Sequence, residues 1–383
     1  MKPVYLDYNA TTPIDPQVAE AMLPFIHEHF GNPSSGHIFG VTTKNAVEKA
    51  RSQVAQVLRC EPDEVIFTSG GSESNNYAIK GAAHAYRGKG NHIITSTIEH
   101  PAVLEVCKYL EEEGFLVTNL PVEGDGIVDV RKVEEAITPQ TILITIMHAN
   151  NEVGTIQPIR EIARIAHVRG ILVHTDAAQS VGKIPVRVDE LDVDLLSVAG
   201  HKLYAPKGIG ALYVRTGVKL EKLIHGASHE MNRRAGTENV IQIVGLGEAC
   251  AMIDENLPVY GEHLRTMRDM LEKDLKERFP DLRINGHPEK RLPNTASVSF
   301  KGLEANAILN EIQGVAASAG SACHSDQMEV SGVLKAMDVP FEYAMGTLRF
   351  SVGRFTTARE IDEALREIVA VVERLRLKTA APL

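Results

Sequence analysis

Short apolar runs alternate with amphipathic segments along the N-terminal part of the chain. Apolar runs of about four to eight residues, closed by polar or glycine-rich residues, predict buried strands. We predict strands at residues 64–69, 92–98, 115–122, 141–148, 171–176 and 194–200, with helical segments between most of them. Strands without polar alternation, separated by helices, indicate a mainly parallel sheet covered on both faces. The predicted fold class is therefore α/β.

The alternation stops near residues 256–258. A charged amphipathic helix is predicted at 262–279, a strand at 295–300, and a C-terminal helix after Thr357 and Glu360, which are spaced as a capping box. Four apolar residues then recur at helical spacing, namely Ile361, Leu365, Ile368 and Val372. We expect two domains: a large α/β domain at 13–258 and a smaller α+β domain at 259–383.

Composition and charge narrow the classes of function. The 383 residues are 44% hydrophobic and 23% charged, which is ordinary for a soluble enzyme with a large core. The net charge is −10, and no basic block is present, which argues against a nucleic-acid partner or an anionic membrane. The N-terminus shows no signal-peptide pattern, and no apolar run approaches the roughly 18 residues of a membrane span. A cytoplasmic location is expected.

The cysteines are Cys60, Cys107, Cys250 and Cys323, far apart and without a CxxC pair. This spacing argues against a disulfide framework or a metal site, and it favours a reducing compartment. Cys323 lies in SAGSACHSD, where the neighbours are small or polar. Such composition predicts a mobile, solvent-facing loop, and accessibility is one requirement for a reactive thiol.

Polar residues follow the predicted strands, and ligands of open α/β sheets gather at the carboxyl ends of strands. Glycines that open a helix present free N–H groups to a phosphate. The residues that follow the strands are Gly70, Gly71 and Ser72, then His100, then Asn151, then Asp176 and Gln179, and finally His201 and Lys202. Together they match the needs of pyridoxal phosphate, which uses a lysine for a Schiff base and a carboxylate for its pyridinium nitrogen.

Each of these residues also has an ordinary structural interpretation. Asp176 could cap a helix, His100 could be a structural histidine, Asn151 could form a turn and Lys202 could lie on the surface. Their joint occurrence at successive strand ends favours the cofactor site.

Ten motifs carry a resemblance to a known family. The chain contains YLDYNATTP, FGNPSSGH, FTSGGSESNN, EHPAV, MHANNEVG, HTDAAQSVGK, GHKLYAPKGIGALYVR, RRAGTEN, SAGSACHS and LRFSVGRFTT, in family order from residue 4 to about residue 375. It resembles the pyridoxal-phosphate-dependent cysteine desulfurases of the class-V aminotransferase type. The resemblance implies fold type I of these enzymes, with residues 1–12 packed on the smaller domain.

The resemblance also implies roles for individual residues. Lys202 would bear the cofactor, Asp176 would hold the pyridinium nitrogen, Gln179 the ring hydroxyl, and His100 would stack on the ring. Gly71, Ser72 and His201 would hold the phosphate, together with Thr237 of the partner subunit in a homodimer. Asn151, at the cofactor site, and Arg349 would bind the substrate carboxylate, for which a planar guanidinium is suited.

Cys323 would be the nucleophile that takes sulfur from L-cysteine as a persulfide, leaving L-alanine. Catalysis would then rest on Lys202, His100 and Cys323, with a sulfur-acceptor protein in iron–sulfur cluster assembly or another sulfur pathway. Two positions depart from the family: Ala199 stands where a serine often donates to the phosphate, and HGASHEMNRRAG lacks the usual three glycines.

Two other functions stay open at the level of sequence. Selenocysteine lyases share the fold, the cofactor and the cysteine segment, so L-selenocysteine is an alternative substrate. The second alternative is a catalytically idle scaffold that binds partner proteins. The presence of both Lys202 and Cys323 argues against it.

Overall fold

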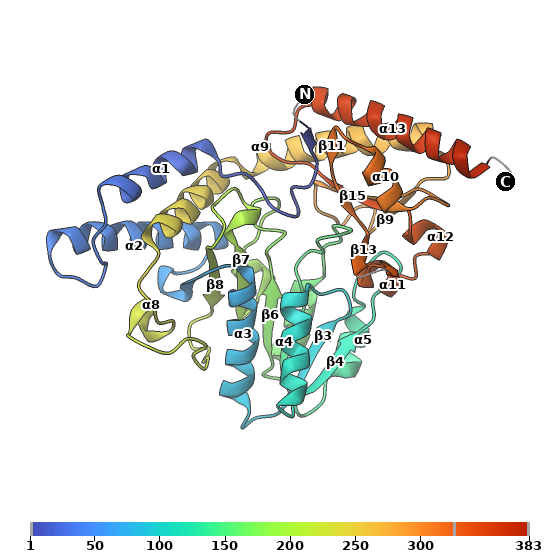
Figure 1. Ribbon diagram of the computed structural model, residues 1–383. Coiled ribbons are helices and arrows are strands. Elements are labelled where there is room, and N and C mark those ends of the chain that lie inside the picture. Colours follow the sequence, from blue (N-terminus) through green and yellow to red (C-terminus); the bar gives the residue numbers. More distant parts are fainter. Residues whose placement is uncertain (1–2, 325–326, 381–383) are drawn as a thin grey trace.

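The computed structural model describes residues 3–324 and 327–380, and for residues 321–324, 327–328 and 379–380 only the main chain. A seven-stranded sheet forms the centre of the larger part of the molecule (Figure 1). All its strands run parallel except β8, which pairs antiparallel with both neighbours. In spatial order they are β2 (Val65–Thr68), β8 (Gly210–Val214), β7 (Leu195–Ala199), β6 (Leu172–Asp176), β5 (Thr141–Thr145), β3 (His92–Ser96) and β4 (Leu116–Leu120).

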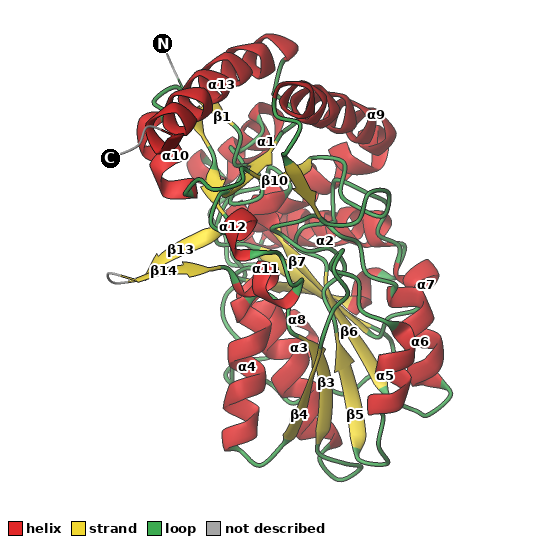
Figure 2. Ribbon diagram, turned by 90° about the vertical axis from the view of Figure 1, so that its right-hand side faces the viewer, coloured by secondary structure: helices red, strands yellow, loops and turns green. Residues whose placement is uncertain are grey.

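Helices cover both faces of this sheet, as Figure 2 shows. Successive side chains of β2 point to opposite faces of the sheet, and both faces are covered, so all four residues of the strand are buried. Ile66 packs with α3 and α4 on one face, whereas Val65 and Phe67 face the core on the other. The helices of this part are α1 (Pro16–His27), α2 (Ile38–Leu58), α3 (Gly71–Tyr86), α4 (Pro101–Glu112), α5 (Val130–Ala136), α6 (Ile159–His167), α7 (Val188–Leu191) and α8 (His229–Asn232).

The C-terminal part is built on a four-stranded antiparallel sheet. Its strands, in spatial order, are β12 (Ser318–Ala319), β15 (Thr347–Ser351), β10 (Thr295–Ser299) and β9 (Arg283–Asn285). Beside it, β1 (Val4–Tyr5) pairs with β11 (Val315–Ala316), and Val4 and Leu6 join its hydrophobic core. Its helices are α10 (Ala305–Glu311), α11 (Gly332–Ala336), α12 (Phe341–Ala344) and α13 (Ala358–Ala380).

A single helix, α9 (Val240–Arg278), joins the two parts and runs through the position where the sequence predicts a domain boundary. Ile243 and Leu246 belong to the core of the large sheet, and Leu264 and Leu271 belong to the smaller core. The boundary at 258/259 therefore falls inside a helix that contains Pro258. The division into 13–258 and 1–12 with 259–383 stays a prediction.

The main chain around Cys323 differs from the expected loop. Residues Ser321–His324 form β13, which pairs antiparallel with β14 (Gln327–Val330), and Cys323 stands opposite Met328. Hydrogen bonding to β14 satisfies main-chain groups that a loop would leave to water, and this pairing overrides the small-residue composition. The hairpin projects from the body of the molecule (Figure 2).

Candidate active site

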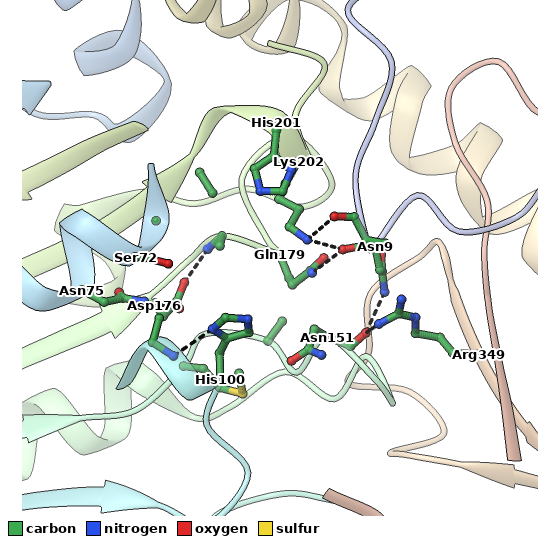
Figure 3. Close-up of a pocket in the computed structure, with 17 residues that line it drawn as sticks. Asn9, Ser72, Asn75, His100, Asn151, Asp176, Gln179, His201, Lys202 and Arg349 are labelled. Atoms are coloured by element: carbon green, nitrogen blue, oxygen red, sulfur yellow. Dashed lines mark hydrogen bonds between the residues drawn. The ribbon is translucent and has the colours of Figure 1, made fainter. Parts of the chain in front are cut away.

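A cavity of about 430 Å³ lies at the carboxyl ends of β5, β6 and β7 (Figure 3). This volume is within the range of small-molecule sites, roughly 300–1,000 Å³. Parallel strands bring their carboxyl ends to one edge, which is why residues far apart in the chain meet here. The predicted residues that line the cavity are Gly71, Ser72, His100, Asn151, Asp176, Gln179, His201, Lys202 and Arg349.

Two predicted residues are not among those that line the cavity. Thr237 is exposed, in the segment between α8 and α9. The side chain of Cys323 lies outside the described part of the structure, which gives only the main chain of β13 there. The roles of both residues stay predictions.

The first turn of α3 forms the anion-binding end of the cavity. Its N-cap, Gly70, has φ of 149°, a conformation that favours glycine, and the sixteen-residue helix then begins at Gly71. The first N–H groups of a helix have no intrahelical acceptor, so those of Gly71 and Ser72 are available to a phosphate. A Cβ at Gly71 would lie 3.2 Å from the Ala199 Cβ, so the site stays open because both residues are small.

His201 adds a neutral ring to this end of the cavity. Its Nδ1 lies 3.1 Å from Thr11 Oγ1. Burial, followed by the charge of Lys202, lowers the pKa of His201 to about 4. The imidazole is therefore uncharged at neutral pH and can act as a hydrogen-bond partner.

Asp176 ends β6 with its carboxylate in the cavity wall and only 6% of its surface exposed. Its Oδ1 accepts from the Ala178 N–H at 2.9 Å, and its Oδ2 accepts from Asn75 Nδ2 at 2.6 Å. Both donors are neutral, so the buried carboxylate of Asp176 has no cationic hydrogen-bond partner. A protonated pyridine nitrogen would be such a partner, and in this respect the site fits pyridoxal phosphate.

His100 caps α4 and opens on the cavity. Its Nδ1 accepts from the Ala102 N–H at 3.1 Å, so the ring proton resides on Nε2. Burial lowers the pKa of His100, while the Asp176 carboxylate opposes that shift. A neutral imidazole with its Nε2 proton free can exchange protons with a bound ligand.

Lys202 closes the short 3₁₀ turn Gly200–Lys202 that follows β7. Its Nζ donates to the main-chain carbonyls of Asn9 and Ala10, the second at 2.7 Å. Burial, and then the charge of Arg349, lowers the pKa of Lys202 to about 8, although Asp7 and Asp176 act in the opposite direction. The amine thus has an appreciable neutral fraction near neutral pH, as a nucleophile or base requires.

Arg349 reaches the cavity from β15, in the smaller part of the molecule. Its guanidinium donates to Asp7 Oδ1 at 2.7 Å, to Ser318 Oγ at 3.0 Å and to the Asn151 carbonyl at 3.1 Å. Its Nε is buried and has no partner among the described groups. These bonds use three of the five N–H donors of the guanidinium, so a second Nη1 donor and the Nε donor are left over in a firmly held side chain that lines the cavity.

Three residues of the site were not singled out by the sequence reasoning: Asn9, Ala10 and Asn75. Asn9 and Ala10 supply the carbonyls that hold Lys202, and Asn75 holds Asp176. All three lie inside the motifs YLDYNATTP and FTSGGSESNN. A search for polar residues directly after the predicted strands does not find these three, because none of them directly follows a strand of the large sheet.

Comparison with known proteins decides the family. The family model described as aminotransferase class-V matches residues 4–364. A cysteine desulfurase IscS of Dictyoglomus turgidum is 50% identical over 375 residues, which cover 97% of this chain and 95% of the relative. The chain belongs to the cysteine desulfurases of the class-V aminotransferase family. This confirms the resemblance and, with it, the dependence on pyridoxal phosphate.

Other cysteine desulfurases show the same full-length likeness. A cysteine desulfurase IscS of Methanosarcina thermophila is 48% identical over 98% of this chain and 93% of its own length. A solved NifS-like protein superposes with a TM-score of 0.91 at 38% identity, covering 97% of this chain and 100% of the other. The predicted α/β fold class is thereby confirmed. None of the described helices of this desulfurase is long and apolar enough to cross a bilayer.

Proposed function

We propose that this desulfurase converts L-cysteine to L-alanine and passes the sulfur, as a persulfide on Cys323, to an acceptor protein. The observation that carries the proposal is the content of the cavity. It combines the low-pKa amine of Lys202, the carboxylate of Asp176 held by neutral donors, and the Arg349 guanidinium, which keeps N–H donors beyond those that protein groups use. A solved structure titled "SspA in complex with cysteine" is 39% identical, with a TM-score of 0.81 over 92% of this chain and 99% of the other, which supports cysteine as substrate.

The cofactor would be held by residues of this chain at five places. Lys202 would bind it covalently, and Asp176 would hold its ring nitrogen. Gln179 would hold the ring oxygen, and His100 would lie against the ring. The phosphate would be held by Gly71, Ser72 and His201, with no hydroxyl from Ala199. When bound, pyridoxal phosphate supplies an electron sink that weakens bonds at the α-carbon of an amino acid.

The substrate would be oriented from the opposite wall. The guanidinium of Arg349 and the side chain of Asn151 would bind the cysteine carboxylate, and this would place the α-hydrogen toward Lys202. The released amine of Lys202 would take that proton, because its lowered pKa leaves it neutral more often than an ordinary lysine. His100 would move the thiol proton through Nε2, the nitrogen that α4 leaves free.

Cys323 would attack the substrate sulfur as a thiolate. A new S–S bond replaces the Cβ–S bond of the substrate, and the carbon keeps the electron pair and gains a proton. The products are L-alanine and an enzyme persulfide, so no external oxidant or reductant is consumed. The persulfide then carries the sulfur to the acceptor.

The test uses the pyridoxal-phosphate-loaded enzyme with L-cysteine. Alanine is quantified by chromatography, and the persulfide is located by alkylation and peptide mass spectrometry. We expect Cys323→Ser to keep the cofactor absorbance and to form no persulfide. Cys60→Ser, at the partly exposed Cys60, is the matched control and should behave as the parent. A persulfide that still forms on the Cys323→Ser variant would show that the nucleophile is another residue.

The same assay separates the alternatives. Turnover of L-selenocysteine with little turnover of L-cysteine would identify a selenocysteine lyase. Failure with both substrates, in a protein that retains the cofactor band, would identify a scaffold. We expect cysteine to be turned over by the parent and by the Cys60→Ser control.

We also propose a homodimer in which each cavity is completed by the partner subunit's Thr237. Four apolar side chains near the α1–α2 connection are exposed: Ile26 by 54%, Phe30 by 81%, Ile38 by 72% and Phe39 by 53%. Phe30 and Phe39 stack with ring centroids 5.5 Å apart. This surface lies at the same end of the molecule as α8 (Figure 1). An exposed apolar cluster of this kind is typical of an interface.

The phosphate end of the cavity supports the same arrangement. Gly71, Ser72 and His201 also line a second, more open cavity of about 390 Å³ on their other side. The proposed phosphate site can therefore be reached from a neighbouring molecule, and a contribution from the partner's Thr237 requires such access.

The cytoplasmic location and the acceptor also stay proposals. Cys60, Cys107 and Cys250 are free thiols, which supports a reducing compartment. An iron–sulfur cluster assembly protein is the acceptor class we propose, because desulfurases named IscS are among the relatives.

A further inference from the structure

Lys183 is a buried lysine next to the active site that the proposed mechanism does not use. It lies at the end of the two turns that follow β6, and only 7% of its surface is exposed. Its Nζ donates to Gln179 Oε1 at 2.7 Å and to Asn9 Oδ1 at 3.2 Å. The charges that act on it are those of Lys202 and Arg349, and together with burial they lower its pKa well below the usual value. A buried amine among cations is costly, so its presence calls for a reason.

The two oxygens that Lys183 contacts are both fixed as acceptors. Asn9 Nδ2 donates to the Asn151 carbonyl at 3.1 Å and to Thr295 Oγ1 at 2.8 Å. Because a carbonyl oxygen can only accept, the amide of Asn9 must turn its Oδ1 toward Lys183. Gln179 Nε2 likewise donates to the Asn9 carbonyl at 3.0 Å, so its Oε1 faces Lys183.

This arrangement decides which end of the Gln179 amide faces the cavity. Gln179 lines the cavity, and its NH₂ group meets the carbonyl that also accepts from Lys202 Nζ (Figure 3). Without a donor at Lys183, the Oε1 of Gln179 would be buried without a partner. The amide would then be held on one side only, by the Asn9 carbonyl, and it could turn its N–H away from the space beside Lys202 to bring the orphaned oxygen to a donor.

We propose that Lys183 is a positioning residue that locks the amide of Gln179 with its N–H toward the ring oxygen of the cofactor. The proposal rests on the proposed role of Gln179 in holding that oxygen. A hydrogen bond donated to the ring oxygen disperses its negative charge and weakens its hold on the proton of the neighbouring lysine–cofactor nitrogen. The bond therefore lowers the pH at which the visible band of the bound cofactor changes.

The test is a pH titration of the visible absorbance of the loaded enzyme without substrate. We expect Lys183→Met to raise the midpoint by about 0.5 to 1 pH unit, the worth of one hydrogen bond. Its dissociation constant for pyridoxal phosphate should rise by about fivefold. Methionine should be accommodated because Lys183 borders a third cavity, of about 370 Å³. Lys183→Gln, one atom too short to reach Gln179, should give the same shift if the methionine variant does not fold.

A double-mutant cycle separates positioning from the charge of Lys183 itself. In a Gln179→Met background, Lys183→Met should move the midpoint no further. An equal shift in both backgrounds, or an unchanged midpoint in the single variant, would overturn the proposal. Because no substrate is present, neither result depends on the sulfur chemistry. A parent protein that binds the cofactor and leaves cysteine unchanged would instead count against the proposed function alone.

Discussion

At the scale of the residue, the partly buried site of Lys202 sets the pKa of its amine, which donates to two main-chain carbonyl oxygens. With a pKa of about 8, roughly one tenth of the amines are neutral at pH 7, about 300 times the fraction of an ordinary lysine of pKa about 10.5. Only the neutral amine attacks an aldehyde. Its reactivity therefore rises with pH and levels off above the pKa.

We predict that the rate at which the cofactor-free enzyme captures pyridoxal phosphate rises with pH through about 8 and is flat above 9. Stopped-flow absorbance measures this rate, with free Nα-acetyl-lysine as the reference amine. A rate that keeps rising between pH 9 and pH 10, parallel to the reference, would show that the site does not perturb Lys202.

The proposed role of Arg349 belongs to the same scale, because it depends on the N–H donors that the protein partners of Arg349 leave unused. Lysine at this position lacks Nε and cannot contact Asp7, the Asn151 carbonyl and a ligand together. Arg349→Lys should raise KM for cysteine about 10- to 100-fold, with a smaller change in kcat and an unchanged cofactor spectrum. Steady-state kinetics beside the absorbance spectrum test this, and an unchanged KM would remove Arg349 from substrate binding.

At the scale of elements, a buried ion pair fastens α8 to α2 and β2. Glu230 accepts from Arg51 at 2.7 and 2.9 Å and from the Phe67 N–H at 2.8 Å, and 5% of its surface is exposed. Its main chain has φ of 47°, so these bonds also hold a strained turn. The segment that carries Thr237 starts from this turn.

We predict that Glu230→Gln lowers the free energy of unfolding by about 3 kcal/mol, because an amide N–H would then face the Arg51 guanidinium. Glu262→Gln is the matched control: its partner Arg265 is 2.8 Å away, but both side chains are more than half exposed, so its cost should stay below about 1 kcal/mol. Denaturant unfolding measures both. Equal effects would mean that burial does not strengthen the Glu230 pair.

At the scale of the whole molecule, the cavity draws on both parts of the chain. Arg349 comes from the smaller sheet, and Lys202 and Asp176 come from the large sheet. The site therefore exists only while the two parts keep their relative position. A second subunit on the apolar surface would complete the phosphate end.

A hybrid-dimer experiment tests that arrangement. Lys202→Ala removes the attachment point, and Thr237→Asp places a carboxylate where the partner's phosphate would lie, so each variant should be nearly inactive. When both are coexpressed, random hybrids hold one intact site in each, and about a quarter of the parent activity should return. Hybrids that form, as shown by two affinity tags, without any recovery would place Thr237 in its own subunit's site, and a Thr237→Asp variant that is active by itself would place Thr237 outside both sites.

The pattern of residues by itself determined the α/β class and most of the site. All strands of the large sheet except β4 are buried on both faces, and a polar residue that follows such a strand emerges at one edge, so His100, Asp176 and Lys202 could be placed at this edge from local sequence. The capping box of α13 was equally local, and the structure confirms it with the Thr357 N–H bonded to Glu360 and the Glu360 N–H bonded to Thr357.

Only the tertiary structure decided the contacts between distant segments. The carbonyls of Asn9 and Ala10 reach Lys202 across more than 190 residues, and the Lys183 amine meets Asn9 across 174. The antiparallel pairing of β8 with β2 likewise joins distant segments of the chain. Periodicity reports the burial of each residue on its own element. It carries no information on which element packs against it, because that choice minimises the free energy of the whole chain.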